Sequence, residues 1–302
     1  MSLKSRLIPI LLLKNGLLVR SQGFATHQII GNPFNEVARF SEWCVDELIY
    51  LDISREGEPD LQRDDLKAND CGNFLSILEE VSRTCFMPLT VGGGIRTIED
   101  MRARFHRGAD KVTLNTLALE QPNLVDEAAG IFGAQALVLS VDARRRGPGD
   151  YEVMAHCGQL ATGRRVEDWA REMEARGIGE ILLQSVDRDG EGKGYDLELI
   201  ECVSACVEVP VICCSGVGRF EDYAPGIKAG AAAVAAANIW HFKELSDRQG
   251  KRALAQAGVD VRKVGLGQPR RSRTPNRRRR LPSRSQPATH NWNALATEGL
   301  IA

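Results

Sequence analysis

The fold is decided by a stretch that occurs twice: Pro88-Leu-Thr-Val-Gly-Gly-Gly-Ile-Arg-Thr-Ile-Glu-Asp100 returns as Pro210-Val-Ile-Cys-Cys-Ser-Gly-Val-Gly-Arg-Phe-Glu-Asp222. The repeat continues in step, because Gly108-Ala-Asp-Lys-Val112 is matched by Gly230-Ala-Ala-Ala-Val234. An interval of about 120 residues is too long for a solenoid unit and fits two halves of one domain. Each copy reads as a strand, a Gly-rich turn, a helical stretch and another strand. Because such a turn can present backbone N–H groups to an anion, two copies predict a ligand with two phosphates, one held by each half.

Around this repeat, short apolar runs alternate with longer amphipathic ones. Eight strands, most of them followed closely by a helix, predict an α/β fold of the (β/α)₈ type, a TIM barrel. A doubly wound open sheet is the alternative, but two four-strand halves close naturally into a ring. The expected strands are Leu7–Leu13, Glu47–Ile53, Pro88–Val91, Lys111–Asn115, Ala136–Val141, Glu180–Ser185, Pro210–Cys214 and Ala232–Ala237. The expected helices are Pro33–Cys44, Cys71–Thr84, Thr97–Arg107, Gln121–Phe132, Val166–Arg176 and Leu197–Val207.

Two polar stretches extend the predicted loops. Arg55–Cys71 follows the second strand, and Arg144–Gly149 follows the fifth. The segment Tyr151–His156 then reads as a small hairpin. Function gathers on the loops after the strands in this fold, so we expect both extensions to border the active site.

Composition narrows the class of protein. The chain has 302 residues, 43% of them hydrophobic, which is enough for one large domain with a buried core. No apolar run approaches the roughly 18 residues of a membrane span, and the N-terminus has no signal-peptide pattern. The eight cysteines lack CxxC pairing, which favours free thiols in a reducing cytoplasm. We therefore expect a cytoplasmic chain without a membrane contact, metal site or cofactor.

The charge is unevenly distributed along the chain. The net charge is −1, but residues 263–302 hold nine basic side chains and one acidic one, so that segment carries +8 and the rest carries −9. Its Arg, Pro and Ser composition predicts a disordered basic tail after a domain of residues 1–262. Such a tail could neutralise nucleic-acid phosphates, fold against the acidic domain, or be an accidental extension. We favour the last, because the Arg-rich stretch has no aromatic side chain on which bases could stack.

Four motifs make the reading more specific: Pro88–Arg96, Lys111-Val-Thr-Leu-Asn-Thr116, Asp187-Arg-Asp-Gly190 with Gly194-Tyr-Asp196, and Ile239-Trp-His-Phe242. In this order they resemble the cyclase subunit of imidazole glycerol phosphate synthase, over about residues 4–262. The resemblance implies a barrel of two similar halves that receives ammonia from a glutaminase subunit bound at its bottom. The ammonia then passes through the barrel to the top. There it joins a bis-phosphorylated aminoimidazole intermediate of histidine biosynthesis.

The same resemblance implies two phosphate sites. The first cradle is Gly94, Asn115 and Thr116, and the second cradle is Gly190, Gly216, Ala237 and Asn238. Glycine lets the phosphate approach the backbone where a side chain would block it. The alternative for any single glycine is the tight turn that every such barrel contains.

The acid–base pair implied by the resemblance is incomplete. Members of the family carry one Asp at the end of the first strand and one at the end of the fifth. Asp142 supplies the second, in Leu139-Ser-Val-Asp142, but Leu12 stands at the place of the first, in Ile8-Pro-Ile-Leu-Leu-Leu-Lys14. Leucine cannot move a proton, and losing one general acid or base costs about 10²–10⁴ in rate. The alternative for Asp142 is a structural carboxylate that caps the next turn.

The bottom of the barrel, by contrast, matches the family. The resemblance implies an ammonia gate of four charged residues, which we call the basal ring: Arg6, Glu47, Lys111 and Glu180. The alternative is an ion-pair layer that merely plugs the barrel, since buried charges need partners. Four further charged residues are expected in the reaction chamber at the top: Arg20, Asp52, Asp187 and Asp189.

Three functions remain open from the sequence. The first, which we favour, is a cyclase paralogue that passes ammonia from its glutaminase to another acceptor, like cyclase-like proteins encoded with surface-polysaccharide genes, which feed an amidotransferase of nucleotide-linked sugars. The second is a cyclase of histidine biosynthesis in which another residue replaces the missing Asp. The third is a non-catalytic scaffold that only activates the glutaminase. All three predict a heterodimer with a glutaminase.

Overall fold

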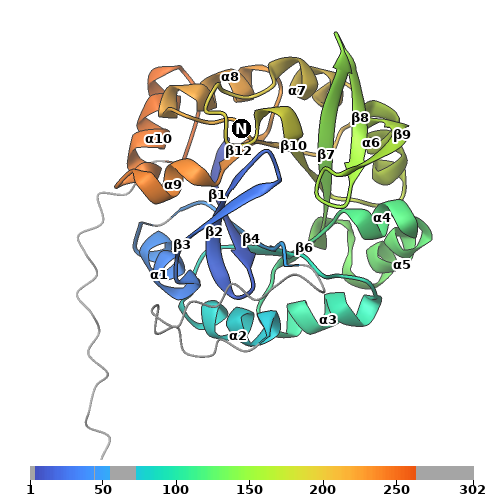
Figure 1. Ribbon diagram of the computed structural model, residues 1–302, viewed down its shortest axis with the longest axis horizontal. Coiled ribbons are helices and arrows are strands. Elements are labelled where there is room, and N and C mark those ends of the chain that lie inside the picture. Colours follow the sequence, from blue (N-terminus) through green and yellow to red (C-terminus); the bar gives the residue numbers. More distant parts are fainter. Residues whose placement is uncertain (1–3, 44, 55–72, 263–302) are drawn as a thin grey trace, which may run out of the picture. The chain divides into compact units, whose positions relative to one another are not determined.

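The computed structural model describes residues 4–43, 45–54 and 73–262, and within them the predicted barrel is present. Eight parallel strands pair in sequence order, and the last pairs with the first through Ala233 beside Arg6 and Ala236 beside Pro9. This closure rules out the open sheet and confirms the (β/α)₈ class (Figure 1). The strands of the ring are β1 (Arg6–Lys14), β4 (Leu48–Asp52), β5 (Leu89–Gly92), β6 (Lys111–Leu114), β7 (Leu137–Gly147), β10 (Glu180–Ser185), β11 (Val211–Cys214) and β12 (Ala233–Ala236).

Helices cover the outside of the ring (Figure 1). Six lie where the periodicity predicts them: α1 (Pro33–Trp43), α2 (Phe74–Thr84), α3 (Ile98–His106), α5 (Asn123–Phe132), α6 (Val166–Ala175) and α7 (Leu197–Ser204). Side-chain caps mark the starts of α2, α3 and α7, and at α3 Thr97 and Asp100 form a capping box. The helical stretch expected in the second copy of the repeat is α8 (Tyr223–Lys228). Three more helices were not predicted: α4 (Thr116–Glu120), α9 (Asn238–Phe242) and α10 (Ser246–Gln256).

The strands divide the core into two layers, as alternation along a strand requires. On β1, Leu7 and Leu11 point outward and pack in the large core beneath the helices. Ile8 and Ile10 point inward and join a separate apolar cluster that fills the barrel. We call this second group the interior cluster: Ile8, Ile10, Ile49, Leu51, Val138, Leu182, Ile212, Cys214, Ala233 and Ala235.

Two hairpins grow from the C-terminal ends of the ring, and they start from corresponding strands of the two halves. β1 continues into β2 (Leu17–Gln22) and β3 (Thr26–Gly31), and β7 continues into β8 (Asp150–Ala155) and β9 (Leu160–Arg165). The second hairpin is larger than the predicted segment Tyr151–His156. The first was not predicted, although Asn15-Gly16, with φ of 51° and 76°, is the residue pair that favours a two-residue hairpin turn.

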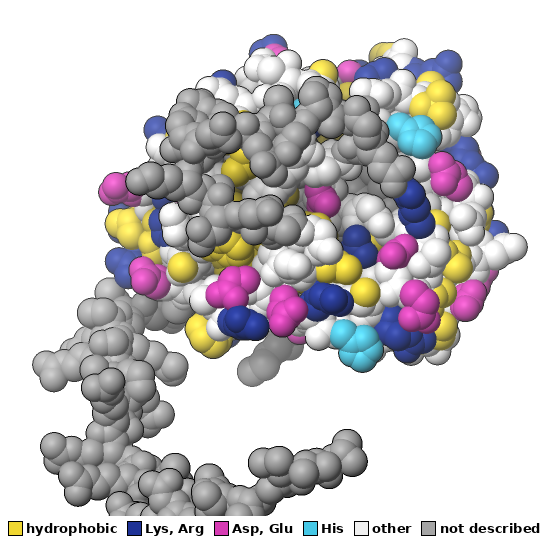
Figure 2. Space-filling view, turned by 60° about the horizontal axis from the view of Figure 1, so that its bottom comes forward, with side chains coloured by type: hydrophobic (Ala, Val, Ile, Leu, Met, Phe, Trp, Pro, Cys, Tyr) yellow, Lys and Arg dark blue, Asp and Glu magenta, His cyan; other side chains and the backbone are white. Residues whose placement is uncertain are grey.

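Some predictions fall outside the described residues. The predicted loop Arg55–Cys71 and the predicted tail 263–302 both lie there, so the domain boundary at 262 stays a prediction. The six cysteines that are described are free thiols, as expected. Among the described residues, every helix is too short or too polar to cross a membrane. On the face seen in Figure 2, acidic and basic side chains are interspersed rather than gathered by sign.

Candidate active site

Two adjoining cavities open at the C-terminal ends of the strands. The larger, of about 290 Å³, is lined mainly by the ends of β1, β4, β6 and β7 and by the segments that follow β4, β5 and β6. The smaller, of about 250 Å³, is lined mainly by the ends of β11 and β12 and by the segments that follow β10, β11 and β12. Asp189, Cys214 and Ala237 line both. The first cradle lies in the larger cavity and the second cradle in the smaller, so one elongated ligand could reach both.

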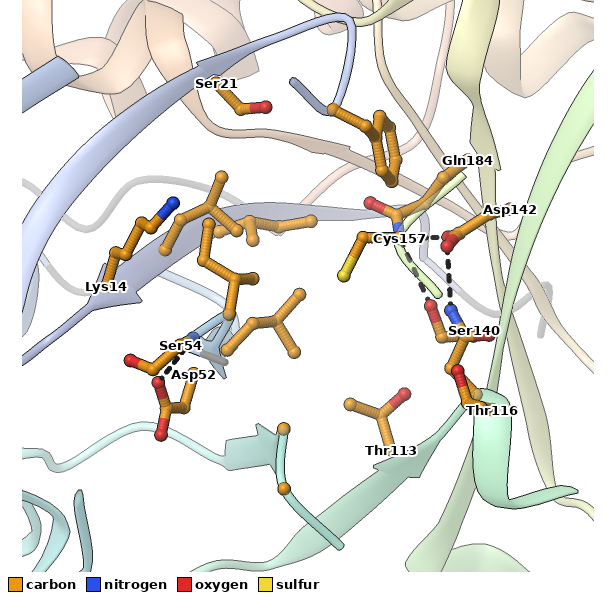
Figure 3. A pocket seen from close by; sticks show the side chains of 18 of the residues that line it. Lys14, Ser21, Asp52, Ser54, Thr113, Thr116, Ser140, Asp142, Cys157 and Gln184 are labelled. Atoms are coloured by element: carbon orange, nitrogen blue, oxygen red, sulfur yellow. Dashed lines mark hydrogen bonds between the residues drawn. The ribbon is translucent and has the colours of Figure 1, made fainter. Parts of the chain in front are cut away.

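Asp142 is the buried carboxylate of the larger cavity. It is 1% exposed, and its two oxygens accept hydrogen bonds from Asn115 Nδ2 at 2.9 Å and Gln184 Nε2 at 3.1 Å. Gln184 Nε2 also donates to Ser140 Oγ at 3.1 Å (Figure 3). Burial raises the pKa of Asp142 to about 6, although both hydrogen bonds oppose that rise and nearby Asp189 adds to it. A carboxyl with this pKa can hold or release a proton near neutrality.

The equivalent place in the first half is apolar. Leu12 pairs with Leu51 on the next strand and Val19 on the hairpin, just as Asp142 pairs with Gln184 and Met154. On the preceding strand, Ala237 corresponds to Asn115, since Ala236 lies beside β1 in the register that Leu114 keeps beside β7.

The polar trio Asn115–Asp142–Gln184 of one half is thus replaced by Ala237–Leu12–Leu51 in the other. All six residues line the larger cavity. The cavity therefore has one polar wall and one apolar wall, and Leu12 is part of a change that involves both of its neighbours.

Four charged residues were expected in the chamber, and the structure separates them. Asp52 lines the larger cavity, across from Asp142 in Figure 3, and Ser54 N donates to its Oδ1 at 3.0 Å. Burial raises the pKa of Asp52, while the bonds from Ser54 and the charge of Arg104 oppose the rise. Arg20 lines only the smaller cavity, with its guanidinium over the ring of Phe242.

Asp189 lines both cavities but is held by the first hairpin. Its Oδ2 accepts from Ser21 Oγ at 2.8 Å and Phe24 N at 3.0 Å, which ties β2 to the second half of the barrel. Asp187 lines neither of the two cavities, contrary to the expectation. It is exposed, and its carboxylate accepts a hydrogen bond from Arg145 N at 2.8 Å. Asp187 lies in a short 3₁₀ helix, Val186–Arg188, which directs its side chain toward the second hairpin.

The first cradle is shaped by two glycines with positive φ. Gly93 and Gly94 have φ of 97° and 60°, and a Cβ on Gly93 would lie 1.9 Å from Asp52 O. A side chain at Gly93 is therefore excluded, and Gly94 is left exposed to the cavity. Asn115, a residue of this cradle, also donates a hydrogen bond from its side-chain amide to Asp142. Thr116 Oγ1 accepts from His156 N of the second hairpin at 3.3 Å.

The second cradle is built in the same way. Gly190 and Gly216 have φ of 73° and 96°, and a Cβ on Gly216 would lie 2.3 Å from Gly194 O. Ser215, which replaces a glycine of the first copy, also adopts a positive φ of 78°. Asn238 exchanges two bonds with the backbone of Ser21, at 2.8 Å and 3.4 Å, and so holds the first hairpin over this cavity.

At the opposite end of the barrel, the basal ring is closed. Arg6 bonds Glu47 and Glu180 at 2.7 Å each, and Lys111 lies 2.6 Å from Glu180 and 3.6 Å from Glu47. Each cation thus touches both anions. Burial alone would lower the pKa of Arg6, but the charges of Glu47 and Glu180 more than offset this and raise it. The interior cluster separates this ring from the two cavities.

Sequence reasoning missed several residues of the site. Gln184 could have been suspected, because it is a polar residue inside an apolar strand of Ile-Leu-Leu-Gln-Ser. Ser140, Lys14 and Cys157 also line the larger cavity. Cys157 comes from the turn of the second hairpin, which no local pattern directs toward the barrel.

Comparisons with known proteins agree with this geometry. The family model described as "Histidine biosynthesis protein" matches residues 6–246. The imidazole glycerol phosphate synthase subunit HisF of Gluconacetobacter diazotrophicus is 44% identical over 263 residues, which is 86% of this chain and 96% of that protein. The chain therefore belongs to the histidine biosynthesis protein family.

Proposed function

We propose that the chain is the cyclase subunit of an imidazole glycerol phosphate synthase. It would receive ammonia from a glutaminase at the basal ring and use it on a bis-phosphate ligand at the two cavities. The observation that carries this proposal is the presence on one barrel of a closed charged ring at the bottom, two glycine-turn cradles at the top and buried Asp142 in the larger cavity. The similarity to a HisF subunit supports it.

Asp142 has the position for the proton transfers that such a reaction needs. Addition of ammonia to a carbonyl carbon forms a C–N bond and leaves an excess proton on nitrogen. The ionised carboxylate can carry two protons in turn from nitrogen to the former carbonyl oxygen, so that the C–O bond breaks with loss of water and a C=N bond remains. Asn115 and Gln184 fix the orientation of the carboxylate from both sides. The interior cluster between the two ends of the barrel is apolar, so it would admit neutral ammonia more readily than ammonium.

The test is turnover of the bis-phosphorylated aminoimidazole substrate by the purified chain, with ammonium salts and then with glutamine plus the glutaminase. Slow but measurable turnover with both nitrogen sources is expected, because Leu12 leaves one acid–base group out. Absence of turnover in both assays would contradict the proposal.

A second candidate is favoured by Leu12 alone: a paralogue that binds a glutaminase and delivers ammonia to another acceptor, such as a sugar amidotransferase. The matched family is described by histidine biosynthesis and the similar subunit by imidazole glycerol phosphate synthase, and neither description mentions nucleotide-linked sugars, so the synthase of histidine biosynthesis is preferred. Glutaminase stimulation without any turnover of the aminoimidazole substrate would reverse this preference.

The acid–base role of Asp142 predicts a simple pH profile. Its pKa is raised to about 6, so the carboxylate is protonated below that pH and ionised above it. We expect kcat/KM with saturating ammonia to rise between pH 5 and 7, with a midpoint near 6, if the ionised form is the base. Steady-state rates across this range check the midpoint. A flat profile would remove Asp142 from the rate-limiting step.

The basal ring predicts an uncoupling variant. Lys111→Met leaves Glu47 and Glu180 with Arg6 as their one cation in the ring, so the ring opens on the side of Lys111. We expect glutamine-dependent turnover to fall about tenfold while ammonium-dependent turnover stays within about twofold, because the chemistry at the other end is intact. Lys193→Met, which removes an exposed ion pair with Glu191, is the control. Equal losses with both nitrogen sources would indicate a folding defect and not a gate.

A further inference from the structure

A buried guanidinium lies directly behind the first cradle. Arg104, on α3, is 5% exposed. Its Nη2 donates to Gly93 O at 2.5 Å, and its Nη1 donates to Asp100 O at 2.9 Å. Its Nε has no hydrogen-bond partner among the described residues. The glycine turn that faces the cavity is therefore in direct contact with a positively charged side chain on its far side.

This charge is not neutralised by an ion pair with any carboxylate that the structure describes. Burial lowers the pKa of Arg104, and the more distant charges of Asp100 and Asp52 only partly oppose that effect. The other side of the group packs on an aromatic ring, with the guanidinium carbon 5.7 Å from the centroid of Phe74. A buried cation is costly unless an anion compensates it, so the surroundings of Arg104 favour the arrival of a negative group.

The open side of the cradle is close enough to feel this charge. A Cβ built on Gly94 would lie 3.6 Å from Arg104 Nη2, so only the backbone of the turn separates the guanidinium from the cavity. Through so thin a layer of low polarity, a charge acts much more strongly than through water.

The second half of the barrel shows that the fold does not require this cation. The repeat that aligns Gly108 with Gly230 aligns Arg104 with Gly226. A Cβ on Gly226 would lie 2.8 Å from the ring of Tyr195 and 2.9 Å from Cys213 Sγ, so an uncharged ring fills this space. The cations that line the second cavity, Arg20 and Lys243, are exposed at its rim.

We infer that Arg104 is a positioning residue that gives the first cradle a fixed positive charge and makes it the stronger phosphate site of the two. A bis-phosphate ligand has two chemically similar ends, and unequal cradles would decide which end binds in which half. The inference rests on one part of the proposed function, the binding of phosphate by both cradles, and does not depend on the reaction.

The test is a titration of the full chain with inorganic phosphate, followed by amide NMR, because the amides of Gly94 and Gly216 report on the two cradles separately. Arg104→Gln keeps a donor for Gly93 O but removes the charge, and Arg104→Lys keeps the charge. We expect Arg104→Gln to weaken phosphate binding at Gly94 about tenfold and to leave Gly216 within about twofold, whereas Arg104→Lys stays within about threefold at both. In turnover assays, KM for the bis-phosphate substrate should rise more than kcat falls.

The matched control is Arg102→Gln on the same helix, where the side chain is partly exposed, bonds Glu99 at 3.3 Å and lies over the ring of Phe132. It should change neither titration. Equal weakening at Gly94 and Gly216 in Arg104→Gln, or no weakening at Gly94, would overturn the inference and leave the proposed function standing. If phosphate shifts neither amide in the unmodified chain, both the inference and the proposed cradles fail.

Discussion

Replacing Asp142 by asparagine is expected to lower the turnover of the bis-phosphorylated aminoimidazole substrate by about 10²–10⁴-fold. Asparagine has nearly the same size and keeps an oxygen that can accept from Asn115 or Gln184. It cannot take up or release a proton near neutral pH. Leu12, at the equivalent position of the other half, offers no second acid or base to compensate. Rates with saturating ammonium measure the loss directly, without the glutaminase.

The control for this variant is Asp187→Asn. Asp187 is a carboxylate at the same end of the barrel, but it lines neither cavity and bonds the backbone of Arg145. Turnover should stay close to that of the parent chain. A comparable loss in both variants would mean that carboxylates act here through general electrostatics and that Asp142 has no special role. Retained activity in Asp142→Asn would assign the proton transfer to another group, with Asp52 the next carboxyl in the larger cavity.

Replacing Leu12 by aspartate is expected to raise turnover with ammonium about 10²-fold, at the lower end of what one general acid or base supplies. The new carboxyl would lie in the wall opposite Asp142, in the equivalent register of the other half. The gain is limited because the flanking residues, Ala237 and Leu51, cannot donate to it as Asn115 and Gln184 donate to Asp142. The new group also replaces apolar packing against the interior cluster, so the melting temperature should fall.

Leu12→Asn separates proton transfer from polarity, because it brings a similar polar group that cannot ionise. It should show the loss of stability without the gain in rate. If Leu12→Asp gives no gain while glutamine hydrolysis and ammonia release remain coupled, the chamber has diverged beyond one residue. That outcome would favour delivery of ammonia to another acceptor.

The sequence alone was enough to determine the barrel of two similar halves. The duplicated strand–turn–helix unit predicts two halves, and the glycines at 93, 94 and 216 have the positive φ that their turns require. The strand starts carry Arg6, Glu47, Lys111 and Glu180, whose alternating charges are readable one strand at a time. These features are local, because strand period, turn chemistry and residue charge do not depend on which strands become neighbours.

Only the tertiary structure decided what each side chain meets. The trio of Asn115, Asp142 and Gln184 joins three strands, and its apolar counterpart around Leu12 is visible only once the registers on both sides are fixed. In the sequence Arg104 looks like an ordinary surface arginine of a helix, yet the packing of α3 against the ring buries it behind the glycine turn of Gly93 and Gly94. Asp187 and Asp189 are two residues apart, but the turn between them sends one to a hairpin and leaves the other between the cavities. Contacts of this kind depend on ring closure and strand register, which are set by the whole barrel and not by any one segment.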